Sequence, residues 1–173
     1  ENEYIFDSTV RFVGDRVAAV AAETIDIARK AVRKIKVEYE VLPAVLDIPS
    51  ALADGAPSVH PGGNVVKEFA LDAGDVERGF AEADEIFEDV YTTPPIHHSA
   101  LENHCYIADC RADGKLTIWR TTQNVFAVRM ILSNIFSIPL HKIRIIKPPQ
   151  GGSFGGKLSL IHEPVVASLS MMT

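Results

Sequence analysis

The stretch PPQGGSFGGKLS (residues 148–159) carries four glycines within six positions. Glycine adopts backbone conformations that a Cβ forbids, and it lets a ligand approach main-chain N–H groups closely. A strand pattern over residues 141–147 precedes the stretch, and a helical pattern follows from about Lys157. Its amides are therefore predicted to lie at a helix N-terminus, where an anionic ligand is favoured. A tight turn that needs glycine for its geometry alone is the alternative.

The same stretch has most of a nucleotide-binding P-loop. Gly151, Gly156 and Lys157 have the required spacing, but a P-loop needs a hydroxyl directly after the lysine to coordinate Mg²⁺. Leu158 has none, and Ser159 comes one position late, which in a helix rotates its side chain by about 100°. A nucleotide-hydrolysing site is therefore not expected.

The residues before this stretch predict a small sheet and a long helix. Asp-Gly within residues 112–115 predicts a hairpin turn between two strands. The helix is expected from about Val125 to Ser137, with Asn124 as its N-cap and Pro139 after its end. Strands are expected over residues 86–91, 98–110, 116–123 and 141–147.

The N-terminal part shows a β-α-β pattern over residues 10–47. Residues 16–23 form a short apolar run, residues 24–35 repeat apolar side chains at helical spacing with Thr24 as N-cap, and residues 35–41 alternate strictly. A segment rich in proline and glycine follows, with at most a short helix near residues 50–53. A further short helix, capped by Asp75, is expected to face inward with Val76, Phe80 and Ala83.

These patterns predict an α+β chain with two domains. The expected division places the first domain at residues 1–48, a linker at residues 49–74 and the second domain at residues 75–173. The sequence begins without methionine and stops at Thr173 within an apolar periodic segment, so we expect a fragment of a longer protein.

Charge and composition exclude several classes of partner. The formal net charge of −6 would repel a phosphate backbone, and the basic residues within 29–36 are interpreted as a solvated helix face. No stretch approaches the roughly 20 apolar residues of a membrane span, and no signal peptide is visible. Two cysteines, Cys105 and Cys110, do not suggest a disulfide framework. We therefore expect a cytoplasmic protein that binds no nucleic acid and has no membrane span.

Histidines and cysteines gather in residues 97–110, which raises the question of a zinc site. On a strand, however, His104 and Cys105 point to opposite faces, which also counts against a Cys–His nucleophilic pair. Buried cysteines and a partly buried histidine explain the group better. Glu102 and His104 share one face, and a catalytic pair there remains an alternative.

Taken together, the motifs resemble a known family. HHSALENHCYIADCRADGKLTIWRTTQNVFAVRMIL (residues 97–132) and IPLHKIRIIKPPQGGSFGGK (residues 138–157) resemble the molybdenum-cofactor-binding subunit of the xanthine dehydrogenase and aldehyde oxidase family. Residues 10–24 and 37–47 resemble the end of the a/b hammerhead domain that precedes it there. The resemblance implies the end of a hammerhead-like domain followed by the first part of the molybdopterin-binding domain.

The resemblance also implies an activity. Family members hydroxylate purines, other N-heterocycles or aldehydes with an oxygen atom from water, using molybdenum on molybdopterin, in some members as a dinucleotide. Electrons leave through iron–sulfur clusters to FAD, carried on other domains or subunits. The expected partners are therefore the rest of the molybdenum subunit, the Fe-S and FAD subunits and a small heterocycle or aldehyde.

The resemblance also assigns site residues by position. Gln123 matches the glutamine that hydrogen-bonds an oxygen ligand of molybdenum, and Phe154 lies in the loop whose backbone is placed against the metal and pterin. The general-base glutamate of the family is expected beyond Thr173, so the isolated chain is expected to be inactive. The expected cofactor-binding residues are Gln123, Gly151, Gly152, Ser153, Phe154, Gly155 and Gly156.

One position departs from the family pattern. Leu158 stands where xanthine-oxidising members carry a glutamate that binds the purine, so the substrate is expected to be less polar or differently recognised. A second hypothesis is a non-catalytic structural or interaction module that keeps the fold. That hypothesis predicts exposed apolar surface at Ile161, Val165, Val166 and Leu169.

Overall fold

The structure is a computed structural model that describes residues 5–173, and it divides into two units. The first unit comprises residues 5–36 with residues 96–173, and the second comprises residues 37–95. In the described part of the chain, no helix is both long and apolar enough to cross a bilayer.

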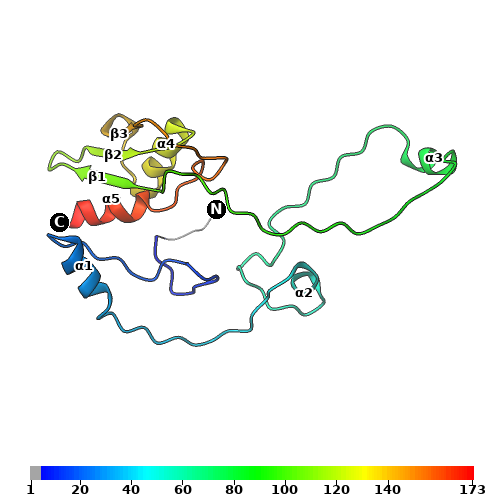
Figure 1. Cartoon of the computed structure of the whole chain (residues 1–173), viewed down its shortest axis with the longest axis horizontal. Coiled ribbons are helices and arrows are strands. Elements are labelled where there is room, and N and C mark those ends of the chain that lie inside the picture. The colour runs from blue at the N-terminus through cyan, green and yellow to red at the C-terminus, as the bar shows by residue number, and fades with distance from the viewer. Residues whose placement is uncertain (1–4) are drawn as a thin grey trace. The chain divides into compact units, whose positions relative to one another are not determined.

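A three-stranded sheet forms the centre of the first unit (Figure 1). β1 (Tyr106–Cys110) and β2 (Leu116–Arg120) pair antiparallel, and β2 pairs parallel with β3 (Ile143–Ile146). Parallel neighbours need a crossover connection. Here α4 (Val125–Phe136) and the short 3-10 helix η1 (Leu140–Lys142) supply it.

Local sequence sets the turns on either side of β2. Gly114, at a φ of 76°, provides the left-handed residue of the hairpin turn. Asn124 caps α4 as predicted, because its Oδ1 accepts a hydrogen bond from Ala127 N at 3.0 Å. The helix ends where Ser137 turns to a φ of 53°, two residues before Pro139.

One apolar cluster holds the sheet and two helices together. The alternate residues Leu116 and Ile118 of β2 are fully buried against Val128 and Leu132 of α4. Ala167 of α5 (Glu163–Met172) belongs to the same cluster. The core therefore anchors β2 and α4, and Gln123 lies in the short connection between them.

The helix predicted near the N-terminus is confirmed, but its flanking strands are not. α1 (Ile25–Val32) begins at Thr24, whose side chain accepts a hydrogen bond from Ile27 N at 3.3 Å. Residues 16–23 and 35–41 pair with no strand in the described part of the chain. A period-two pattern specifies which face is apolar but supplies no hydrogen-bonded neighbour, and without one the ladder does not form.

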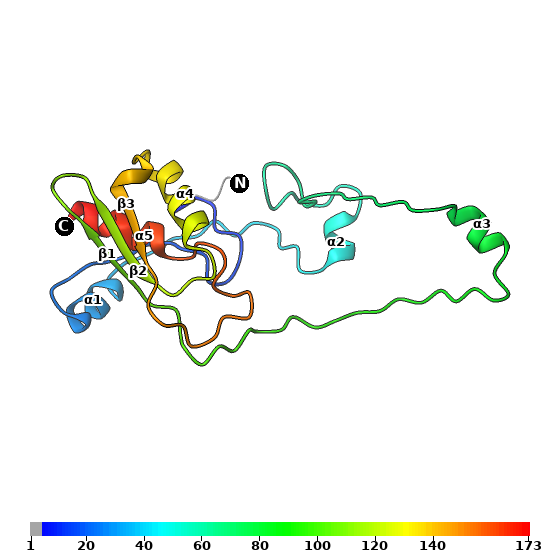
Figure 2. The same ribbon diagram turned by 90° about the horizontal axis from the view of Figure 1, so that it is seen from above.

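The second unit contains two short helices and no strand (Figure 2). α2 (Ile48–Leu52) and α3 (Val76–Ala81) are capped by Asp47 and Asp75. The strand predicted over residues 86–91 is absent. The inward face predicted for α3 is also wrong, because Val76 is 52% and Phe80 56% exposed, and no sheet in this unit lies beside them.

Two further expectations at the C-terminal end are wrong. Helix α5 begins at Glu163, several residues later than predicted, because the chain after the glycines continues as an irregular loop. The predicted apolar surface is not exposed: Val165 is buried, and Ile161, Val166 and Leu169 are half-buried. Helix α5 packs against β1, which accounts for much of this burial.

Replacing Leu132 by alanine should destabilise the first unit. Leu132 is fully buried in the cluster, so its truncation should lower the free energy of unfolding by about 2–5 kcal/mol. Met130→Ala, on the same helix but at a 54% exposed position, should cost less than about 1 kcal/mol. Urea unfolding followed by circular dichroism measures both, and equal effects would contradict the assigned core.

Candidate functional site

The glycine loop, defined as residues 151–157, adopts a conformation that most residues avoid. Gly152 and Gly155 have φ values of 92° and 90°, which glycine adopts without a steric penalty. Phe154 has a φ of 49°, an unusual value for a residue with a Cβ. The loop is therefore a fixed irregular turn and not the first turn of a helix.

Several polar groups in this loop and next to it have no hydrogen-bond partner in the part of the chain that the structure describes. The main-chain N–H groups of residues 152–155 donate to no other group within the described residues. Directly before the loop, Gln150 Oε1 is a buried side-chain acceptor that likewise has no hydrogen-bond partner within the described residues. Open amides together with an orphaned acceptor are typical of a site that receives a polar ligand.

Two of the glycines are explained by close neighbours. A Cβ on Gly151 would lie 2.8 Å from the Cβ of Glu102, and one on Gly156 would lie 3.0 Å from the ring of His98. Both distances are shorter than packed carbon atoms accept. The segment around residues 98–102 therefore lies against the loop, which the sequence patterns did not indicate.

Lys157 ends the loop and is almost completely buried, at 1% exposure. Its Nζ lies 2.6 Å from Glu102 Oε2, so the amine is committed to a carboxylate. Its carbonyl oxygen accepts hydrogen bonds from Arg120 Nη2 at 3.0 Å, from Thr122 Oγ1 at 3.1 Å and from Gln123 N at 3.3 Å. Both ends of this residue are therefore fixed.

Gln123 lies next to Lys157, the last residue of the loop. Its main-chain N–H donates a hydrogen bond to the Lys157 carbonyl oxygen, and the residue is exposed. Two segments that are distant in sequence thus meet at one point. Phe154 and Leu158 are 73% and 52% exposed, and they give this part of the surface two apolar side chains.

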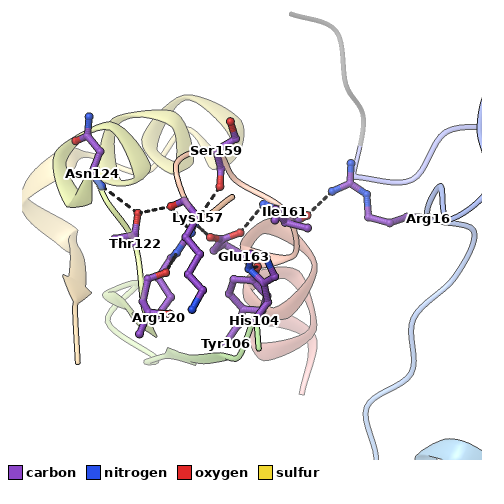
Figure 3. A network of polar contacts seen from close by, with 11 residues as sticks. Arg16, His104, Tyr106, Arg120, Thr122, Asn124, Lys157, Ser159, Ile161 and Glu163 are labelled. Atoms are coloured by element: carbon purple, nitrogen blue, oxygen red, sulfur yellow. Dashed lines mark hydrogen bonds and ion pairs between the residues drawn. The ribbon is translucent and has the colours of Figure 1, made fainter. Parts of the chain in front are cut away.

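A buried ion pair supports the chain after the loop (Figure 3), and no sequence pattern indicated it. Arg120 at the end of β2 pairs with Glu163 at the start of α5, and both side chains are fully buried. Arg120 Nη1 also donates to Ser159 O at 3.3 Å, and Glu163 Oε2 accepts from Ile161 N at 2.7 Å. The irregular segment before α5 is thus held in place by Arg120 at one point and by Glu163 at another.

The histidine and cysteine group is dispersed. The strand predicted from residue 98 begins only at Tyr106, because the preceding residues lie against the loop and not against β2. Cys105 is exposed and Cys110 half-buried, and within the described residues no group of three potential ligands could hold a metal. The Glu102–His104 pair is not formed either: Glu102 turns to Lys157, and His104 Nδ1 lies 3.1 Å from Tyr106 Oη.

Comparison with known proteins identifies the family. The family model described as "Molybdopterin cofactor-binding domain" matches residues 59–173, which is well over half of the chain. The chain belongs to this family. A second model, the a/b hammerhead domain of aldehyde oxidase and xanthine dehydrogenase, matches residues 1–43. These matches confirm the resemblance and the α+β class, with a hammerhead region before a molybdopterin-binding region.

Curated members of this family are similar over nearly the whole chain. A probable xanthine dehydrogenase subunit of Bacillus subtilis is 42% identical over 95% of the chain and 22% of its own length. The nicotinate dehydrogenase large molybdopterin subunit of Eubacterium barkeri is 35% identical over 98% of the chain and 40% of its own length. The chain thus spans less than half of either relative.

Solved structures of the family share the fold. Quinoline 2-oxidoreductase from Pseudomonas putida 86 matches with a TM-score of 0.78 and 30% identity over 87% of the chain and 20% of its own. Aldehyde oxidoreductase from Desulfovibrio gigas matches with a TM-score of 0.73 and 30% identity over 87% of the chain and 17% of its own. These relatives are oxidoreductases.

Removing the charge of Glu163 should destabilise the first unit strongly. Glu163→Gln leaves the Arg120 guanidinium buried without a counter-ion, which should cost about 3–5 kcal/mol. Asp109→Asn removes a carboxylate from the exposed pair with Arg111 and should change stability by less than about 1 kcal/mol. Thermal and urea unfolding compare the two, and a neutral Glu163→Gln would contradict the role assigned to this pair.

His104 should titrate at lower pH than an ordinary histidine. Although His104 is an exposed residue, partial removal of its ring from water lowers its pKa below the ordinary value of 6.5, and the positive charges of Lys157 and Arg120 lower it further. The unfolded chain then binds the proton more readily, so this contribution to stability is complete above pH 6.5 and is lost as the pH falls through the folded-state pKa.

NMR titration of the His104 ring measures this pKa directly. His104→Gln should remove the corresponding loss of stability below pH 6.5, while His60→Gln, in the second unit, should leave it in place. A ring that titrates at or above 6.5 would contradict the described surroundings.

Proposed function

We propose that this chain is a fragment of the molybdenum-binding subunit of a molybdenum hydroxylase, comprising the end of its hammerhead-like domain and the first part of its molybdopterin-binding domain. In this proposal the glycine loop and Gln123 hold the molybdopterin cofactor, and the chain divides at residues 1–48, 49–74 and 75–173. The observation that carries the proposal is the run of four amides at residues 152–155 that have no partner within the described residues, in a loop whose last residue, Lys157, accepts a hydrogen bond from Gln123 N. Membership of the molybdopterin-binding family supports it.

The residues present fit such a cofactor. Main-chain N–H groups at a glycine-rich turn can contact an oxygen-rich ligand without an intervening side chain. The Gln123 amide can donate a hydrogen bond without carrying charge. When bound, the cofactor supplies the chemistry that transfers an oxygen atom from water to a carbon atom and takes up two electrons. This part of the chain binds the cofactor and orients it.

For the substrate, we propose an N-heterocycle or an aldehyde of low polarity. Leu158 and Phe154 are the exposed apolar side chains of the loop region, and an apolar rim favours a flat, weakly polar molecule over xanthine. Relatives are named for xanthine, nicotinate, quinoline and aldehyde, and quinoline and aldehyde lie within this range.

For the electrons, we propose iron–sulfur and FAD partners. Relatives are named as subunits of larger oxidoreductases, and the chain spans 22% of the first. Turnover should therefore need the rest of the molybdenum subunit, including a general-base glutamate outside this chain, as well as these partners.

The proposal is tested on the full-length protein by its content of molybdenum and pterin. Wild type should copurify with both. Gln123→Ala should weaken retention of the cofactor about 10- to 100-fold, because a side chain that orients the metal group is lost. Asn134→Ala, which removes an exposed amide from α4, should retain the wild-type content. A wild-type protein with neither molybdenum nor pterin would refute the proposal.

A further inference from the structure

Glu102 contacts both ends of the glycine loop. Its Oε2 lies 2.8 Å from Gly151 N and 2.6 Å from Lys157 Nζ. Its own main-chain N–H donates to Gly151 O at 3.1 Å. One residue, 49 positions upstream of the loop, therefore binds the first residue of the loop twice and the last residue once.

From these contacts we propose that Glu102 is a positioning residue. By holding the two ends of the glycine loop in place, it keeps the loop amides free to bind a ligand. Glu102 acts through Gly151 and Lys157 and does not itself contact the ligand in this proposal. We call the ion pair between Glu102 and Lys157 the loop clamp.

The loop has two main-chain hydrogen bonds of its own, from Gly156 N to Ser153 O at 2.8 Å and from Leu158 N to Gly155 O at 3.3 Å. Both lie in its second half, so its first half depends on contacts from outside. Glycine loses more conformational freedom on folding than any other residue, and the loop contains four. Phe154 holds an unfavourable φ of 49°, and strain of this kind persists only where the surroundings enforce it. Four amides without a partner would gain by folding back onto the chain. The clamp fixes both ends and excludes that alternative.

The close approach of Glu102 also explains Gly151. A Cβ at position 151 would lie 2.8 Å from the Glu102 Cβ, so any larger residue would push the carboxylate away from the Gly151 amide. Gly151 has no positive φ, and therefore its backbone conformation does not demand glycine. The close contact with Glu102 is what requires glycine at this position.

Lys157 extends the effect of Glu102 to Gln123. The Lys157 side chain is 2% exposed, whereas that of Glu102 is 31% exposed, so removing this carboxylate would leave the buried lysine without its counter-ion. The Lys157 carbonyl in turn binds Gln123 N. Glu102 thereby positions both parts of the proposed cofactor site, the loop amides directly and Gln123 through Lys157.

The surroundings of Glu102 favour positioning over proton transfer. The hydrogen bond from Lys157, followed by that from Gly151, lowers the pKa of this carboxyl below its ordinary range. A carboxylate that is held ionised by two donors is a poor proton acceptor near neutral pH.

Hydrogen exchange of the full-length protein, prepared without cofactor, tests the clamp. Glu102→Ala should raise the exchange rate of the hydrogen-bonded amides of this region, those of Gly151, Gly156 and Leu158, about tenfold or more, while α4 and the sheet keep their protection. Glu102→Gln should show a smaller rise, because its amide oxygen still accepts a hydrogen bond. This variant also serves if Glu102→Ala fails to fold.

Matched variants separate the clamp from general loss of stability. Lys157→Met should reproduce part of the local effect, and adding it to Glu102→Ala should give little further change, because Glu102→Ala already removes the Glu102–Lys157 contact. Glu163→Gln, which breaks the other buried pair, should instead loosen α5. Unchanged exchange of the loop in both clamp variants would overturn the proposal, and so would a uniform rise across all peptides of the first unit.

The link to the cofactor rests on the proposed function and has a separate measurement. If wild type carries molybdenum, Glu102→Ala should reduce retention about tenfold or more, with partial recovery in Glu102→Gln. Retention equal to wild type despite a loosened loop would overturn the link to the ligand. If wild type carries no molybdenum, the proposed function fails, and hydrogen exchange still decides whether Glu102 closes the loop.

Discussion

The carbonyl oxygen of Lys157 is the point on which the site depends. It accepts hydrogen bonds from Arg120, Thr122 and Gln123, all at or just beyond the end of β2. Three donors from one short segment fix the position of this acceptor, and a network of this kind is rigid when all its members are satisfied. The glycine loop is thereby joined to the central strand of the only sheet in the described residues, and the core beneath that strand determines where the loop lies.

The polar groups around this carbonyl have two roles: one pair stabilises the fold, and one contact determines the shape of the loop. Arg120 and Glu163 are fully buried and fasten the irregular segment before α5, and such a pair is costly to break because each charge has left water. Glu102 is partly exposed and contacts the first and the last residue of the loop. The first pair keeps the segment folded, and the second contact determines how open the loop remains.

The cofactor-binding role proposed for this loop draws on membership of the molybdopterin-binding family as well as on the geometry. Open amides suit many anionic ligands, and a glycine loop between a strand and a helix occurs in nucleotide-binding proteins as well. The buried, carboxylate-paired Lys157 separates this loop from a P-loop, whose lysine must reach a phosphate. In that respect the contact with Glu102 distinguishes the two types of site.

The sequence by itself determined the local features: the caps at Thr24, Asp75 and Asn124, the hairpin turn at Gly114, and the turn-forming glycines of residues 151–156. Each depends on neighbouring residues or on a motif, so a short stretch suffices. Only the tertiary structure decided that residues 16–23, 35–41 and 86–91 form no ladder, because a strand needs a partner. It alone decided that Glu102 meets Lys157 and that Arg120 meets Glu163. Those pairs join residues that lie far apart in the chain, and no periodic pattern records contacts at such a distance.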